Sequence, residues 1–156
     1  MPISATHAEP PSPPIERRRV MALAARATLD ELRGALAVLG APDAVDLRPI
    51  ETGLVMLRGR TGGDGAPFNL GEATVTRAAV RIPSGEVGFA YLLGRDAARA
   101  RAAAVLDAMA QRVGAQAVAD GALAGVRARV AAEDATAAAR AAATKVDFFT
   151  MVRGED

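Results

Sequence analysis

The feature that most restricts the fold of this sequence is a change of periodicity in its middle. Four consecutive segments there have strand character and lie between stretches with helical spacing. The expected strands are residues 45–50, 54–60, 72–82 and 87–93. Pro83-Ser84-Gly85-Glu86 separates the last two and has proline and glycine at turn positions. A connection this short joins antiparallel strands, so we expect a hairpin here.

Two helices are expected before the strands. Apolar residues recur at helical spacing over residues 15–27. Thr28 stands three residues before Glu31, which is a capping-box pattern for the start of a second helix. Gly40 and Pro42 mark the end of that helix.

Helical spacing returns after the strands. Asp96 is expected to cap a helix whose apolar side extends to Val113. The other side of this helix carries charged residues, namely Arg99, Asp107 and Arg112. A less regular link containing Gly121 and Gly125 then leads to a long alanine-rich helix, expected over residues 126–143.

This order of elements predicts an α+β fold: a four-stranded antiparallel sheet flanked by helices, with an extended C-terminal tail. The 156 residues suffice for one domain. We expect a disordered leader over residues 1–14, which contain five prolines. A single α+β domain should cover residues 15–145, and a docking tail residues 146–156. A doubly wound nucleotide-binding fold is disfavoured.

The tail is unusually apolar for a chain terminus. Burying Phe148, Phe149, Met151 and Val152 would contribute roughly 6 to 12 kcal/mol at about 1.5 to 3 per side chain. Ordering nine residues costs on the order of 1 to 2 kcal/mol each, so the balance is close to zero. We therefore interpret the tail as a docking element for another protein. The candidate partner-interface residues are Glu51, Phe148, Phe149, Met151 and Arg153.

Composition excludes several classes of function. A net charge of +1, with basic and acidic residues intermixed, argues against a nucleic-acid binder. The chain has no cysteine, which excludes a disulfide framework, a thiolate nucleophile and cysteine-based metal sites, and suits the cytoplasm. The leader has no apolar run of the kind found in a secretion signal or a membrane span. The single histidine, His7, lies in that leader.

No catalytic or metal-binding set is visible in the sequence. Four acidic residues are candidate metal ligands by type but show no ligand spacing: Glu51, Glu72, Asp96 and Asp107. No nucleophile and base can be paired either. We therefore expect no catalytic residues and no metal site, which points to binding, assembly or completion of another subunit's site.

Arginines on the third expected strand suggest one binding function. Alternation places Arg77 and Arg81 on one face, about 13 Å apart along the strand. Arg60 and Arg95, each near a strand end, could join them in binding a polyphosphate. The alternative is that these arginines pair with carboxylates of this chain or of a partner. The acids considered for such pairs are Glu51, Glu72 and Asp147.

Several motifs that lie apart in the sequence occur in an order typical of one known protein family. They are Glu51-Thr52-Gly53-Leu54-Val55, Thr74-Val75-Thr76-Arg77-Ala78-Ala79-Val80-Arg81, Gly62-Gly63-Asp64-Gly65, Gly94-Arg95-Asp96 and the tail over residues 146–154. Together, and in this order, they resemble the PhnG family of the bacterial carbon–phosphorus lyase system. The resemblance extends from about residue 15 to the end. The sequence departs from it in the leader, at Arg58, and at Leu123-Ala124-Gly125-Val126, where a proline is expected.

The resemblance implies a subunit of a cytoplasmic complex with PhnH, PhnI and PhnJ, in which paired copies form a two-fold core. With PhnI, PhnH and PhnL, the family supports displacement of adenine from ATP by an alkylphosphonate. The product is ribose 1-alkylphosphonate 5-triphosphate, on which PhnJ then cleaves the carbon–phosphorus bond. It also implies that this subunit holds no cofactor of its own, and that ATP is the co-substrate of the complex.

The sequence leaves two hypotheses for the function of this chain. The leading hypothesis is a subunit, not catalytic on its own, of α-D-ribose 1-methylphosphonate 5-triphosphate synthase, a transferase of organic phosphonate catabolism. The alternative is a nucleotide- or triphosphate-binding module that uses Arg60, Arg77 and Arg81 as substrate-binding residues. An independent enzyme has little support, because no acid, base or nucleophile stands out.

Overall fold

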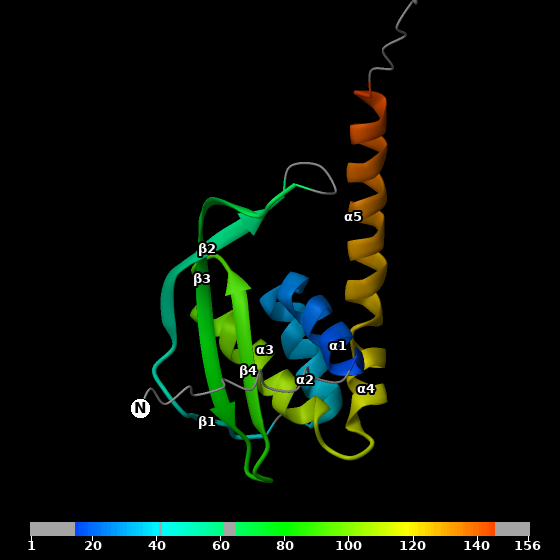
Figure 1. Ribbon diagram of the computed structural model, residues 1–156. Helices are drawn as coiled ribbons and strands as arrows, with labels where there is room; N and C mark the ends of the chain where they lie inside the picture. Colours follow the sequence, from blue (N-terminus) through cyan, green and yellow to red (C-terminus); the bar gives the residue numbers. More distant parts are fainter. Residues whose placement is uncertain (1–14, 41, 61–64, 146–156) are drawn as a thin grey trace, which may run out of the picture.

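The computed structural model describes residues 15–40, 42–60 and 65–145 of the chain. Within them, two helices precede four strands, and three helices follow (Figure 1). The elements are α1 (Ile15–Arg26), α2 (Leu29–Leu39), β1 (Val45–Asp46), β2 (Glu51–Gly59), β3 (Phe68–Arg81), β4 (Val87–Leu93), α3 (Ala97–Ala110), α4 (Ala115–Ala122) and α5 (Ala124–Ala143). The expected α+β class and four-stranded antiparallel sheet are confirmed. The leader and the tail lie outside the described residues.

The long strand β3 organises the sheet. Its first part pairs with β2, from Gly59 opposite Phe68 to Glu51 opposite Arg77. Its last part pairs with β4 through the expected hairpin. Because β4 occupies one edge of β3 along this part, β1 and β2 must share the other edge.

Three strand predictions were wrong in their limits. The first strand was expected over residues 45–50 but ends at Asp46, shortly before Pro49, which has no N–H to donate to a ladder. The second and third strands instead begin earlier than expected, at Glu51 and Phe68. β2 pairs with residues 68–77 of β3 over its whole length, and this pairing compensates for residues of weak strand propensity.

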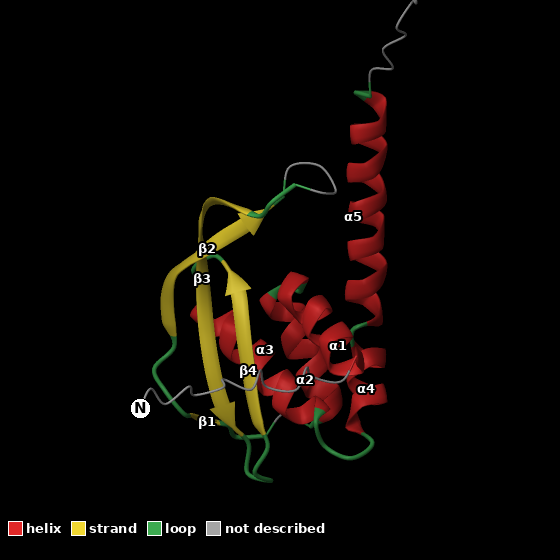
Figure 2. Ribbon diagram, in the orientation of Figure 1, coloured by secondary structure: helices red, strands yellow, loops and turns green. Residues whose placement is uncertain are grey.

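The helices lie on one side of the sheet (Figure 2). We call the side they pack against the covered face; its buried residues are Thr76, Ala78, Val80, Ile82, Gly88, Ala90 and Leu92. Helix α3 lies directly on β4, since a Cβ added at Gly88 would be 1.9 Å from the carbonyl oxygen of Ala104. Leu32 of α2 and Leu106 and Met109 of α3 complete the core.

The helix limits follow local signals at several points. The backbone N–H of Thr28 donates to Glu31 Oε2 at 2.7 Å and the N–H of Glu31 donates to Thr28 Oγ1 at 3.2 Å, which confirms the capping box. Gly40 ends α2 in the left-handed conformation, with φ of 75°. Asp96 caps α3 by accepting a hydrogen bond of 2.9 Å from the N–H of Arg99.

The region after α3 differs from expectation. Helix α3 ends at Ala110, so Val113, expected on its apolar side, is fully exposed. The link with two glycines contains the short helix α4, whose Ala119 is buried among the other helices. The last helix begins at Ala124, two residues before the predicted start.

Asp107, which helical spacing placed opposite the apolar side of α3, is buried. Its side chain is 1% exposed and accepts two hydrogen bonds of 2.7 Å from Arg17 of α1. It also accepts a hydrogen bond of 2.8 Å from the backbone N–H of Phe89. Burial of this carboxylate is tolerated because a guanidinium and an amide satisfy it. Asp107 therefore joins α1, α3 and β4.

Helix α5 is packed only at its start. Val126 is buried, and Arg129 donates to Glu31 of α2 at 2.9 Å. Residues 131–143 are all exposed, and this outer part of α5 projects from the body (Figure 1). Among the described residues, none of the helices combines the length and the apolar character needed to cross a membrane.

Candidate functional site

The face of the sheet that points away from the helices carries large apolar side chains. On β4, Phe89, Tyr91 and Leu93 are 51%, 60% and 68% exposed. They alternate with the small or buried residues of the covered face, as expected for a strand. The corresponding residues of β2 and β3 include Val55, Leu57 and Val75. We call this surface the open face.

An ion-pair cluster lies in the middle of the open face. Arg77 Nε donates to Glu51 Oε2 at 2.9 Å, and Arg48 Nη2 donates to the same oxygen at 2.7 Å. The hydrogen bond from Arg77, and then the charges of Arg48 and Arg77, lower the pKa of Glu51 from its usual value. A shallow groove of about 280 Å³ runs beside this cluster and is also lined by Val75 and Tyr91. The cluster thus sits in an apolar surround.

One end of the sheet extends beyond α1, α2 and α3 (Figure 1). We call β2 together with residues 68–74 of β3 the arm (Figure 1). Leu54 and Met56 point to one side of the arm, Val55 and Leu57 to the other, and all four are exposed. A two-stranded ribbon that exposes apolar residues on both sides gains little stability from its own packing. Contiguous exposed apolar surface of this kind is typical of interaction sites.

The two edges of the sheet differ. Side chains of α3 and of its C-cap residue bind the outer edge of β4: Gln111 Nε2 donates to the carbonyl of Val87 at 2.8 Å, and Arg99 Nη2 donates to that of Leu93 at 2.9 Å. Asp107 accepts from the N–H of Phe89 between them. Among the described strands, β2 pairs only with β3, so its other edge faces no strand. Strand addition is therefore hindered at β4 and open at β2.

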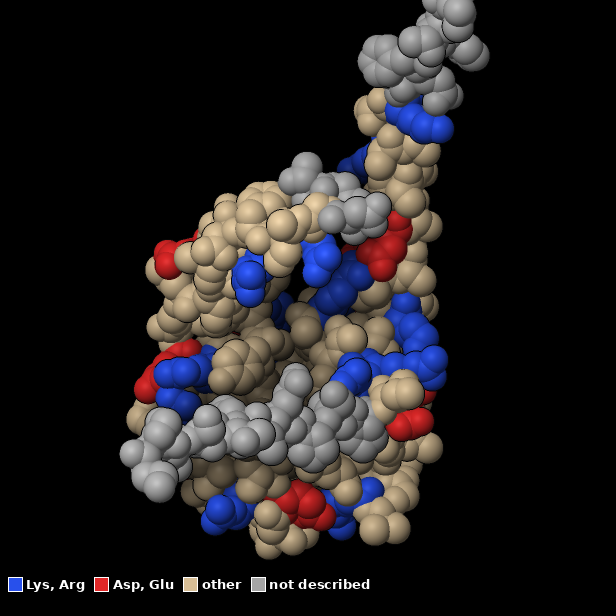
Figure 3. Space-filling model, viewed as in Figure 1, with Lys and Arg blue, Asp and Glu red and all other residues tan. Residues whose placement is uncertain are grey.

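The arginines singled out from the sequence do not come together. Arg77 lies on the open face and pairs with Glu51, as the alternative interpretation anticipated. Arg81 ends β3, whereas Arg60 follows β2 at the far end of the arm. The 14 residues of β3 span about 43 Å, too far for Arg60 and Arg81 to bind one small anion. Figure 3 shows basic and acidic side chains intermixed over the visible surface rather than one basic field.

Of the candidate partner-interface residues, the structure describes Glu51 but not the four in the tail. Glu51 is on the open face, within its ion-pair cluster. Phe148, Phe149, Met151 and Arg153 lie outside the described residues. Within the described ranges there is no group of three or more metal-binding side chains. The described candidate site is therefore an exposed apolar surface with a polar centre.

The sequence reasoning missed Phe89, Tyr91 and Leu93. A signal for them exists, because the strand alternates small residues, Gly88 and Ala90, with large ones. That pattern identifies two unlike faces. It does not tell which face the helices cover, and for an isolated chain the large side chains would be expected inside.

Comparison with known proteins points to one family. The model of a family described as phosphonate metabolism protein PhnG matches residues 15–154. A curated relative from Rhizobium meliloti (strain 1021) is the alpha-D-ribose 1-methylphosphonate 5-triphosphate synthase subunit PhnG. The two sequences are 55% identical over 142 residues, which are 90% of this chain and 91% of the relative.

Proposed function

The chain belongs to the PhnG family of phosphonate metabolism proteins, and from this premise we propose that it is a subunit of an α-D-ribose 1-methylphosphonate 5-triphosphate synthase. The observation that carries the proposal is identity of 55% across nearly the whole of both chains. The activity is that of a transferase: an alkylphosphonate displaces adenine from ATP. We assign ATP to the complex as co-substrate and no cofactor to this subunit.

Genetic complementation tests this function. A Rhizobium meliloti strain that lacks its own PhnG should fail to grow with methylphosphonate as the sole phosphorus source. Expression of this chain should restore growth, because the two sequences are related along their whole length. Growth on phosphate is the control. A soluble, well-expressed chain that does not restore growth on methylphosphonate would contradict the assignment.

Within the complex, the proposed role is assembly. We propose PhnI, PhnH and PhnJ as partners in a cytoplasmic two-fold core, with PhnL as a functional partner. The support is the distribution of apolar surface: Phe89, Tyr91 and Leu93 on the open face, and both sides of the arm, are exposed in the single chain. Exposed aromatic residues grouped with an arginine are typical of the centre of protein interfaces.

A co-expression pull-down with PhnI tests the open face. Substitution of Phe89 and Leu93 by serine removes two large apolar side chains and should abolish recovery of PhnI. The matched control is Val38→Ser on α2, because Val38 is 65% exposed, close to the 68% of Leu93, but lies outside the sheet. Equal recovery with all variants would contradict an interface on this face. Circular dichroism should confirm that each variant is folded.

The tail is tested separately. Removal of residues 146–156 should abolish co-purification with PhnI and leave a folded, soluble body. Unchanged co-purification would count against the docking tail but would leave the family assignment intact, because complementation measures that independently. The nucleotide-binding alternative is not proposed, since Arg60, Arg77 and Arg81 are spread along the sheet.

A further inference from the structure

Acidic side chains are scarce on the open face. The four described strands contain three acids. Asp46 is opposite Val80 and therefore belongs to the covered face. Glu72 is opposite Met56, on the side of the arm that faces away from the open face. Among the acids of the described strands, Glu51 alone is on the open face.

Arginines on the open face outnumber this acid. Arg77 donates to Glu51 Oε2 at 2.9 Å, and Arg48, which precedes β2, donates to the same oxygen at 2.7 Å. Arg81 lies on the same face of β3, four residues after Arg77. The side chains of Arg48 and Arg77 are each 42% exposed, so neighbours already cover much of their surface. One carboxylate therefore faces three guanidinium groups, and the open face has an excess of positive charge.

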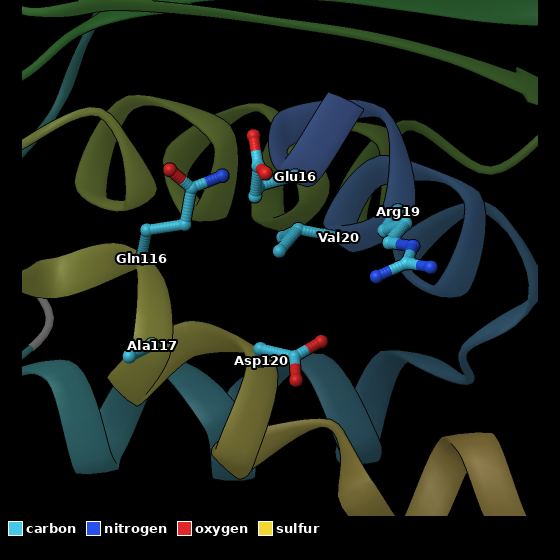
Figure 4. A pocket seen from close by; sticks show the side chains of 6 residues that line it. All are labelled: Glu16, Arg19, Val20, Gln116, Ala117 and Asp120. Atoms are coloured by element: carbon cyan, nitrogen blue, oxygen red, sulfur yellow. The ribbon is translucent and has the colours of Figure 1, made fainter. Parts of the chain in front are cut away.

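The helical side of the molecule does not share this excess. Figure 4 shows the hollow between α1 and α4, where Arg19 lies with two acids, Glu16 and Asp120. Arg129 of α5 likewise donates to two glutamates. The whole chain carries 19 basic and 18 acidic residues apart from its histidine, so the excess on the open face is local.

The apolar surround makes this excess unfavourable when the face is covered. Val75 and Tyr91 line the groove of about 280 Å³ beside Glu51 and Arg77. A partner that packs on these apolar side chains also removes water from the guanidinium groups, and an uncompensated charge is costly once it is desolvated. A basic residue of the partner would add a like charge, whereas an acidic residue would compensate the excess. Small-molecule sites begin at about 300 Å³, so the groove suits a protein side chain better than a separate ligand.

We propose that the protein partner of the open face inserts an aspartate or glutamate side chain into the groove beside Glu51. Its carboxylate accepts hydrogen bonds from Arg77 and Arg48, and apolar residues that flank it in the partner pack on Val75 and Tyr91. The inference rests on the proposed function, because it describes the partner that the assembly role requires. It adds the sign of the charge that this partner must carry.

Charge substitutions in the co-expression pull-down with PhnI test this sign. Arg77→Gln removes a charged donor to the partner's carboxylate and should weaken the complex by about tenfold, measured from the PhnI recovered over a dilution series at about 0.15 M salt. Glu51→Gln removes a competing negative charge, so recovery of PhnI should be unchanged or higher. If the partner instead supplied a basic residue, Glu51→Gln would be the weaker variant. Any loss of recovery with Glu51→Gln, or no loss with Arg77→Gln, overturns the proposal.

Arg127→Gln is the matched control. Arg127 is 47% exposed and paired with an acid, much like Arg77 at 42%, but it lies on α5. A loss equal to that of Arg77→Gln would refute a role specific to the open face. Circular dichroism should confirm folding, and Arg48→Gln, which lies outside the strands, provides the same test with the same expected loss if Arg77→Gln is unfolded.

The same experiment separates this inference from the proposed function. If the unsubstituted chain fails to recover PhnI, the partnership itself is contradicted, and the inference falls with it. If the unsubstituted chain recovers PhnI and the charge variants do so equally well, only the inference is contradicted.

Discussion

The two faces of the β3–β4 hairpin bury their apolar side chains to very different degrees. On the covered face, Gly88 and Ala90 let α3 approach closely, and Leu92 is 1% exposed. On the open face, Phe89 and Tyr91 are both at least half exposed. An isolated globular protein usually places its largest apolar residues inside. The difference teaches that the chain's own helices complete only one side of this sheet.

Adjacent leucines on β4 provide the strongest test of this difference. Leu92→Ala empties a fully buried site and should lower the free energy of unfolding by about 2 to 5 kcal/mol. Leu93→Ala makes the same chemical change at a side chain that is 68% exposed, and should cost about 1 kcal/mol or less. Urea unfolding of the two variants measures both losses in the free energy of unfolding. Similar losses would show that the open face contributes to the stability of the single chain.

A pair of glycines tests the closeness of α3 to the sheet. A Cβ at Gly88 would lie 1.9 Å from the Ala104 carbonyl oxygen and 2.5 Å from the Ala108 nitrogen, so Gly88→Ala must displace the helix backbone. We expect a loss of about 2 to 3 kcal/mol. Gly53 pairs with Val75 on the open face and has no atom within 4 Å of its added Cβ. Gly53→Ala should therefore change stability by about 0.5 kcal/mol or less. Thermal unfolding of both variants measures the two losses of stability. Equal losses would contradict the close approach of α3 at Gly88.

Two aspartates compare a buried with an exposed ion pair. Asp107 and Asp46 each have an oxygen 2.7 Å from an arginine, but their side chains are 1% and 39% exposed. Asp107→Ala also leaves the N–H of Phe89 without its acceptor. We expect a loss of about 2 kcal/mol, less than for a fully buried pair because Arg17 can be hydrated. Asp46→Ala should cost about 0 to 1 kcal/mol. Chemical denaturation measures the free energy of unfolding of both variants. A larger loss for Asp46→Ala than for Asp107→Ala would contradict this explanation.

The smallest predicted effect depends on pH. A hydrogen bond from Arg129, and then one from the backbone of Thr28, lower the pKa of Glu31 from 4.5 to about 2. A lowered pKa means that ionised Glu31 stabilises the fold above its unfolded pKa, and that this contribution is lost as pH falls toward about 2. Glu31→Gln should therefore cost about 1 kcal/mol at neutral pH, allowing for solvent screening.

The stabilities of Glu31→Gln and the parent protein should converge as pH falls from 4.5 to about 2. The comparison on the open face is Glu51→Gln, which removes a more exposed carboxylate and should have a smaller effect. Unfolding curves recorded across this pH range provide the measurement. A constant difference between Glu31→Gln and the parent protein would show that the loss does not arise from ionisation.

Local signals in the sequence predicted much of the fold. The period-two alternation of β3 correctly placed Arg77 and Arg81 on one face, and the Pro83–Glu86 turn correctly predicted the hairpin. Thr28 and Asp96 correctly marked two helix starts. These features depend on neighbours within a few residues. The pairing that extends β2 and β3 beyond their predicted limits instead depends on contacts between strands, which propensity does not encode.

Features that depend on distant contacts were missed. Helical periodicity grouped Asp107 with exposed charges, but its burial depends on Arg17, which is 90 residues away in sequence. The open face could be read as a pattern of small and large residues, yet its exposure follows from the positions of α1 to α3. The arginines suggested for polyphosphate binding show the same dependence on distance: alternation gives the face of an arginine, and separation along a strand of 14 residues decides what it can reach.

The projecting part of α5 has a thermodynamic consequence. Arg26 of α1 pairs with Glu133 and Asp134, and the nine exposed residues beyond them, 135–143, form about 14 Å of helix whose helicity relies on alanine propensity and on the anchored first turns. A lone segment of this length is only marginally helical in water. Its amide protons should exchange rapidly, with fraying that grows on warming. A molecule that binds this segment in its helical form would shift the helix–coil equilibrium toward the helix. Binding would then cost the conformational entropy of the frayed residues, and this cost increases with temperature.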